Sequence, residues 1–145
     1  MQTELVTQSN EFSSKENLLR NTLRGNAAFS IITGLAFVLA QRPLSNFIGI
    51  SPDWILLIIG LTLLPFAYIV YRVATLPSMD IRAAKSIITM DIIWVVASFA
   101  FLLLAWNTLT VAGKWFVFLQ AEAISTFAIF QTIGVRRLLK SMIGK

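Results

Sequence analysis

Two acidic residues, Asp91 and Glu122, lie inside long apolar stretches, whereas every other acid of the chain lies in or beside a polar segment. Transfer of a carboxylate from water into hydrocarbon is costly, so an acid at such a position generally serves a ligand, a proton or a partner. Asp91 and Glu122 are therefore the first candidates for a functional site.

The depth of the two acids along their helices separates them. Each helical residue advances about 1.5 Å, so Asp91, six residues beyond Lys85, lies roughly 9 Å inside the apolar layer. Glu122, fourteen residues before Arg136, lies about 21 Å from the same edge. A separation of roughly 12 Å disfavours a shared proton and predicts two stations along one interior path.

Further polar residues accompany these acids at helical spacing. Ser98 follows Asp91 by seven residues, and Trp94 lies between them on the same helix face. Asn26 and Ser30 share a face of the first apolar stretch, and Ser30 lies about as deep as Asp91. The predicted ligand-binding residues are Glu122, Asp91, Ser98, Trp94, Ser30 and Asn26.

A structural role remains open for the same residues. Asp91 could join helices by hydrogen bonding to Asn26, Ser30 or Gln131, because polar side chains commonly hold membrane bundles together. Trp94 could fill the bundle interior rather than stack against a ligand. The sequence does not distinguish the structural role from the ligand-binding role.

The composition indicates a membrane protein. The chain of 145 residues is 57% hydrophobic and 13% charged, whereas soluble domains carry about 25% charged residues. Cys and His are absent, which excludes thiol chemistry and His/Cys metal sites, and we expect no metal, no cofactor and no enzymatic activity. The net charge is +5, but the basic residues flank the apolar stretches, so we expect no nucleic-acid partner.

Four apolar stretches predict an all-α fold, a membrane four-helix bundle. Ser13 and Glu16 form a capping box, which predicts a short amphipathic N-terminal helix that turns at Gly25 into the first span. We expect residues 1–12 to form a flexible tail and residues 13–145 a single transmembrane domain. The predicted spans are about 25–40, 54–71, 81–106 and 114–135, and residues 44–50 are expected to dip into the outer interface.

The Lys and Arg residues predict the orientation of the bundle. Ten of them lie on the side that carries both termini and the 72–85 connection, and two lie on the other side. This bias predicts that both termini are cytoplasmic, in the cell inner (cytoplasmic) membrane. Arg136 and Arg137 follow the last span, where we expect them to contact anionic lipid headgroups.

Short motifs resemble a known kind of protein. The run Gly25-Asn26-Ala27-Ala28-Phe29-Ser30, the Thr33-Gly34-Leu35 segment, Asp91-x-x-Trp94 and the Arg136-Arg137 end are similar to small uncharacterised bacterial four-helix integral membrane proteins. The resemblance extends over roughly residues 18–140. It implies a small bacterial four-helix membrane protein, and it implies no activity for this chain.

Two functions fit these observations. The first is binding, with or without transport, of a small amphipathic or cationic molecule or a proton in an intramembrane cavity, with the buried acids as counter-charges. The alternative is an accessory or scaffold subunit of a larger membrane complex, with the acids facing a partner helix. Expected partners are membrane lipids, a small-molecule ligand, and a second copy or another membrane protein.

Overall fold

The computed structural model describes residues 2–143, with side chains described for residues 13, 14 and 16–143. This part of the chain is all-helical and contains no strand, which confirms the all-α part of the predicted fold. Its helices are α1 (Gln2–Leu39), α2 (Gln41–Ile48), α3 (Trp54–Thr75), α4 (Ile81–Leu104) and α5 (Val111–Ile143). By length and composition, α3, α4, α5 and the Glu16–Leu39 part of α1 can each cross a membrane.

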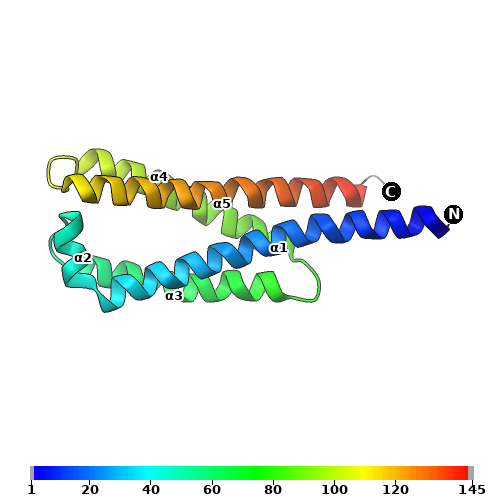
Figure 1. Cartoon of the computed structure of the whole chain (residues 1–145), viewed down its shortest axis with the longest axis horizontal. Helices are drawn as coiled ribbons and strands as arrows, with labels where there is room; N and C mark the ends of the chain where they lie inside the picture. The colour runs from blue at the N-terminus through cyan, green and yellow to red at the C-terminus, as the bar shows by residue number, and fades with distance from the viewer. Residues whose placement is uncertain (1, 144–145) are drawn as a thin grey trace.

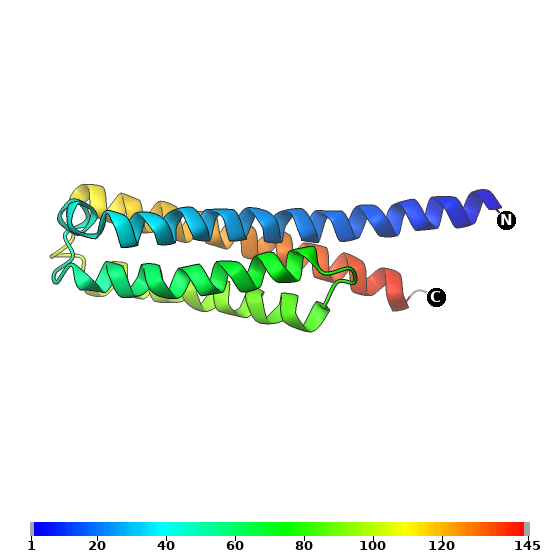
Figure 2. The ribbon, with the colours of Figure 1, turned by 90° about the horizontal axis from the view of Figure 1, so that it is seen from below.

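The four long helices run alternately up and down (Figure 1). The N-terminus, the C-terminus and the α3–α4 connection lie at one end, and α2 and the α4–α5 turn lie at the other (Figures 1 and 2). We call these the terminal end and the α2 end. Large apolar side chains such as Ile32, Ile69, Ile93 and Leu119 are exposed on the four helices, as expected for surfaces that face lipid.

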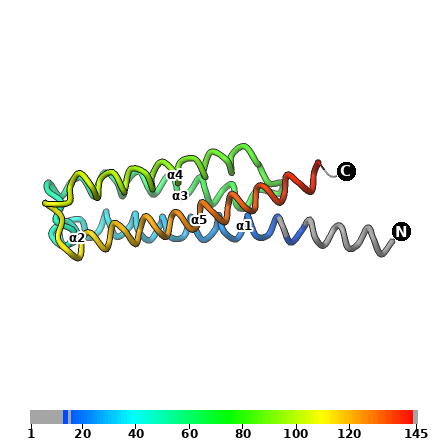
Figure 3. The backbone as a smooth tube through the Cα atoms, turned by 90° about the horizontal axis from the view of Figure 1, so that it is seen from above, coloured from blue at the N-terminus to red at the C-terminus, as the bar shows by residue number. Residues whose placement is uncertain are grey.

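The helices pack as two pairs, α1 against α3 and α4 against α5 (Figures 1 and 3). Helices α1 and α5 join the pairs along one side, whereas α3 and α4 make few contacts. A Cβ atom added to Gly60 would lie 2.7 Å from the carbonyl oxygen of Gly34, so this glycine pair brings the backbones of α1 and α3 together.

Side-chain caps fix two helix starts. The Asp80 carboxylate accepts hydrogen bonds from the backbone N–H groups of Arg82 and Ala83 and so caps the start of α4. Thr110 precedes α5, and its hydroxyl oxygen accepts from the N–H of Gly113 at 2.9 Å. The same hydroxyl donates to the carbonyl of Phe47 and thereby fastens α2 to α5.

The predicted break at Gly25 is wrong, because α1 continues through Gly25 and the capping-box residues Ser13 and Glu16 lie within it. Helix α1 begins at Gln2, where the sequence predicts a tail. Leu19 and Leu23 are fully buried against α3 and α5, so the predicted surface helix is part of the bundle core. Tertiary packing over these leucines outweighs the roughly 1 kcal/mol that a glycine costs inside a helix.

Two further boundaries differ from the predictions. Helix α5 begins at Val111 and extends to Ile143, beyond the predicted end of the last span at residue 135. The segment expected to dip into the outer interface forms the C-terminal part of α2, which ends at Gly49 with a φ of 88°. Glycine adopts this left-handed conformation without the clash that a side chain would cause.

Candidate functional site

Asp91 lies inside the bundle, on α4, and is held by a residue of α1. The Asn26 side-chain amide donates a hydrogen bond of 2.7 Å to the Asp91 carboxylate. Ser30 donates to the Asn26 side-chain oxygen at 3.4 Å. Asn26 is 0% exposed and Asp91 3%. The hydrogen bond predicted between Asp91 and Asn26 is thus confirmed. Ser30 is linked to Asp91 indirectly, through Asn26.

Gln131 of α5 completes this polar cluster. Its side chain is fully buried and makes no hydrogen bond with the side chains that the structure describes. It lies close to the Asp91 carboxylate but forms no well-aligned hydrogen bond with it. The side-chain amide of Gln131 has two N–H donors, and a carboxylate accepts such donors. The cluster of Asn26, Asp91 and Gln131 therefore joins α1, α4 and α5 in the core.

A cavity of about 200 Å³ borders Asp91. Helices α1, α3, α4 and α5 all contribute to its wall. The lining residues are Ser30, Thr62, Leu63, Phe66, Met90, Asp91, Trp94 and Ile124. Phe66 follows Pro65, which cannot donate a backbone hydrogen bond inside α3. The buried acid thus faces open space rather than a filled core.

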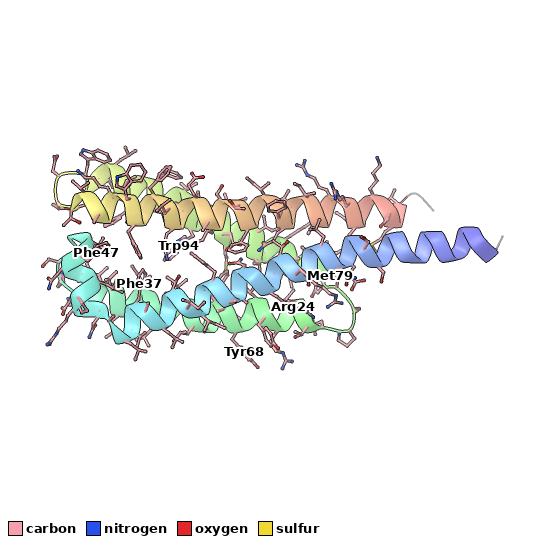
Figure 4. All side chains as sticks on the ribbon, viewed as in Figure 1. Arg24, Phe37, Phe47, Tyr68, Met79 and Trp94 are labelled. Carbon is pink, nitrogen blue, oxygen red and sulfur yellow. The ribbon has the colours of Figure 1, made fainter. Side chains whose placement is uncertain are left out.

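A second cavity, of about 260 Å³, lies towards the α2 end. Its wall is largely apolar, with Ser98 and Gln120 as polar members. The lining residues are Phe37, Ile48, Ile50, Leu56, Ile59, Trp94, Ala97, Ser98, Phe101, Phe116, Val117 and Gln120. Figure 4 shows Trp94 between the α4–α5 pair and the α1–α3 pair, in the half of the bundle that also contains Phe37 and α2.

The two cavities share Trp94 as a lining residue, and we refer to them together as the two sections of the α3–α4 groove. On α4, Asp91 borders the first section, Ser98 the second, and Trp94 both. On α5 the order runs from Ile124 to Gln120. Helices α3 and α4 make few contacts with each other, and the lining residues Thr62 and Met90 are exposed, so the groove opens between these two helices. Predicted residues Asp91, Ser98, Trp94 and Ser30 line it, and Asn26 holds Asp91 from behind.

Glu122 does not belong to this site. Its side chain is exposed on the outer face of α5, away from both groove sections. The prediction of two acid stations along one interior path is therefore wrong. The cause is helical phase: Glu122 lies two residues, about 200°, from Gln120, which faces inward.

Gln120 is a site residue that the sequence interpretation missed. Its side-chain amide donates a hydrogen bond of 3.1 Å to the Thr33 hydroxyl on α1. The signal was available, because Gln120 and Gln131 are eleven residues, about three turns, apart and so share one helix face. Two amides on one face of an apolar helix predict an interior face with polar contacts.

The predicted lipid-headgroup residues Arg136 and Arg137 are both exposed near the end of α5. Arg136 also borders an open groove of about 410 Å³ between α4 and α5. Small side chains, among them Ser125, Ala128 and Thr132, line this groove. Its apolar floor and basic end suit the acyl chain and phosphate of a membrane lipid.

Comparison of the chain with protein-family models, curated proteins and solved structures finds no match. Function is therefore inferred from the residues of the α3–α4 groove and from their geometry.

Proposed function

We propose that this chain is an integral membrane protein that binds a small amphipathic molecule in the α3–α4 groove. The observation that carries the proposal is the position of Asp91, a buried carboxylate that borders a cavity. A carboxylate in an apolar site attracts a cationic or hydrogen-bond-donating group strongly, because little water screens it. Such a group of the ligand would lie at Asp91.

The second groove section supports an amphipathic ligand. Its wall is mostly aliphatic and aromatic, so it suits a hydrocarbon chain or ring system next to the polar group. The sideways opening between α3 and α4 supports entry from the bilayer rather than from water. A molecule that partitions into the membrane is thus the best-supported ligand class.

The proposal is tested with dodecylamine and its uncharged analogue dodecanol. Binding to the purified full-length chain in lipid nanodiscs is measured by equilibrium partition of each radiolabelled probe. We expect dodecylamine to bind at least about tenfold more tightly than dodecanol, because loss of one buried ion pair costs 2 kcal/mol or more. Asp91→Asn should remove this preference, since the amide keeps the size of the side chain but not its charge.

Glu122→Gln is the matched control, because it removes the other acid of the apolar stretches without altering the groove. It should leave the preference for the amine unchanged. Equal binding of dodecylamine to the wild type and to Asp91→Asn would exclude Asp91 as the counter-charge.

We also propose that the terminal end faces the cytoplasm of a bacterial cell, across its inner membrane. The ten-to-two bias of Lys and Arg supports this orientation. The chain contains no Cys, so single cysteines report location cleanly. In whole cells, a membrane-impermeant maleimide should label Asn46→Cys near the α2 end and not Ser78→Cys in the α3–α4 connection. The reverse pattern would invert the proposed topology.

A further inference from the structure

Glu122 is the centre of an exposed apolar stripe on α5. Trp115 and Leu119 precede it, and Thr126 and Ile129 follow it, at the spacing that places residues on one helix face. Trp115 and Leu119 are each 61% exposed and Ile129 is 56% exposed. We call this surface the Glu122 face.

The depth of Glu122 places its carboxyl group within the hydrocarbon layer. Lys114 lies eight residues before it, about 12 Å away along the helix, and Arg136 fourteen residues after it, about 21 Å away. An acid side chain is too short to reach water across either distance. Exposure of a carboxylate to lipid at this depth carries a large free-energy cost.

The described side chains offer no compensation for that cost. None of the hydrogen bonds or ion pairs among the described side chains involves the Glu122 carboxyl group, and only its backbone carbonyl accepts, from the Thr126 hydroxyl. Asp91, in contrast, has Asn26 as an intramolecular partner. A membrane acid without an internal partner indicates a partner outside the chain.

We propose that the Glu122 face binds a transmembrane helix of another protein, one that carries a Lys or Arg at the depth of Glu122. Charge complementarity determines this choice of partner. A second copy of the chain supplies no such group, because residues 25–40, 54–71, 86–106 and 115–135 contain no Lys or Arg. The neighbouring Ala123 and Thr126 are small and allow a second helix to approach closely.

The test uses synthetic helices as probes. A Leu/Ala transmembrane peptide with one central Lys, the same peptide with Leu at that position and a third with Glu are each reconstituted with the full-length chain in phosphatidylcholine vesicles. Association is measured by energy transfer between labelled chain and labelled peptide. We expect the Lys peptide to associate about three- to tenfold more tightly than the Leu peptide, as one interhelical polar contact allows.

Glu122→Gln should reduce binding of the Lys peptide to the level of the Leu peptide, whereas Asp91→Asn should leave it unchanged. Because Glu122 is exposed, the Gln variant keeps the folded core, which circular dichroism verifies. Equal association of all three peptides would overturn the proposal. So would energy transfer between differently labelled copies of the chain that depends on Glu122, because it would identify self-association instead. The result is independent of the α3–α4 groove, since the Asp91 variant controls for it.

Discussion

The hydrogen bond between Asn26 and Asp91 should couple the stabilities of α1 and α4. Asn26→Ala removes the donor and leaves a buried carboxyl group without its partner. The same substitution made in an Asp91→Ala background removes the packing of the amide and its contact with Ser30, both of which are also lost in the Asp91 background. We therefore expect Asn26→Ala to be much more destabilising when Asp91 is present.

The size of the coupling follows from the geometry. The donor and acceptor are 2.7 Å apart, and both residues are nearly fully buried. Hydrogen bonds between membrane helices contribute about 0.6 kcal/mol on average and up to about 1.7 kcal/mol. A short bond that water does not reach belongs near the upper value, so we expect a coupling free energy of about 1.5 kcal/mol.

The assay is a double-mutant cycle on the full-length chain in mixed micelles. Unfolding by sodium dodecyl sulfate is followed by circular dichroism for the wild type, both single variants and the double variant. Thr33 and Gln120 provide the matched control pair, since their hydrogen bond is longer, at 3.1 Å, and only partly buried. Their coupling free energy should be below about 0.5 kcal/mol.

A coupling below about 0.5 kcal/mol for Asn26 and Asp91 would refute this reasoning. It would mean that the Asp91 carboxylate finds an equally good partner elsewhere, with Gln131 as the nearest alternative. Repeating the Asn26–Asp91 cycle in a Gln131→Leu protein tests this alternative. If Gln131 replaces Asn26 as the partner, its removal should restore the coupling between Asn26 and Asp91.

Four further substitutions test the packing of the bundle. Gly60→Ala should lower the free energy of unfolding by about 1–3 kcal/mol, because the new methyl group would meet the Gly34 carbonyl. Gly25→Ala is the matched change at a less crowded position, where the new methyl group meets only the edge of the Phe127 ring at 3.1 Å. It should be neutral or stabilising by up to about 1 kcal/mol. Arg20→Ala should cost about 1–2 kcal/mol, since this guanidinium donates to the carbonyl of Ala74 near the end of α3 and to that of Pro77 in the α3–α4 connection. Thr110→Val should cost about 1 kcal/mol through loss of the α5 cap. Thermal unfolding in detergent measures each change, and a Gly25→Ala variant less stable than Gly60→Ala would contradict the close α1–α3 crossing.

The polar layer around Asp91 could be predicted from the sequence because depth and helical phase are both properties of local spacing. Ser30, Asp91 and Gln131 each lie five or six residues from a Lys or Arg at the edge of an apolar stretch, so counting along each helix brings them to one level. The structure gathers Asn26, Ser30, Asp91 and Gln131 around one cluster. Which of these residues forms the hydrogen bond depends on helix rotation, which spacing alone does not determine.

The location of Glu122 could not be predicted from depth and hydropathy. Both acids have apolar neighbours in the sequence, and an apolar neighbour in a membrane helix can face either lipid or protein. The deciding information is the pair Gln120 and Gln131, whose shared face marks the interior of α5. The continuity of α1 through Gly25 was missed for another reason, since burial of Leu19 and Leu23 depends on helices distant in sequence.

The two membrane acids therefore require different explanations of how the chain tolerates them. Asp91 is compensated within the fold by Asn26, and its remaining capacity to accept hydrogen bonds faces a cavity. Glu122 has no compensation among the described side chains and faces outward. The proposed ligand binding at Asp91 and the proposed helix binding at Glu122 would use different sides of the bundle, so neither proposal excludes the other. Helix α5 lines the groove with Gln120 and carries Glu122 on its opposite face. If the protein binds a ligand in the groove and a partner helix at Glu122, α5 would therefore contact both.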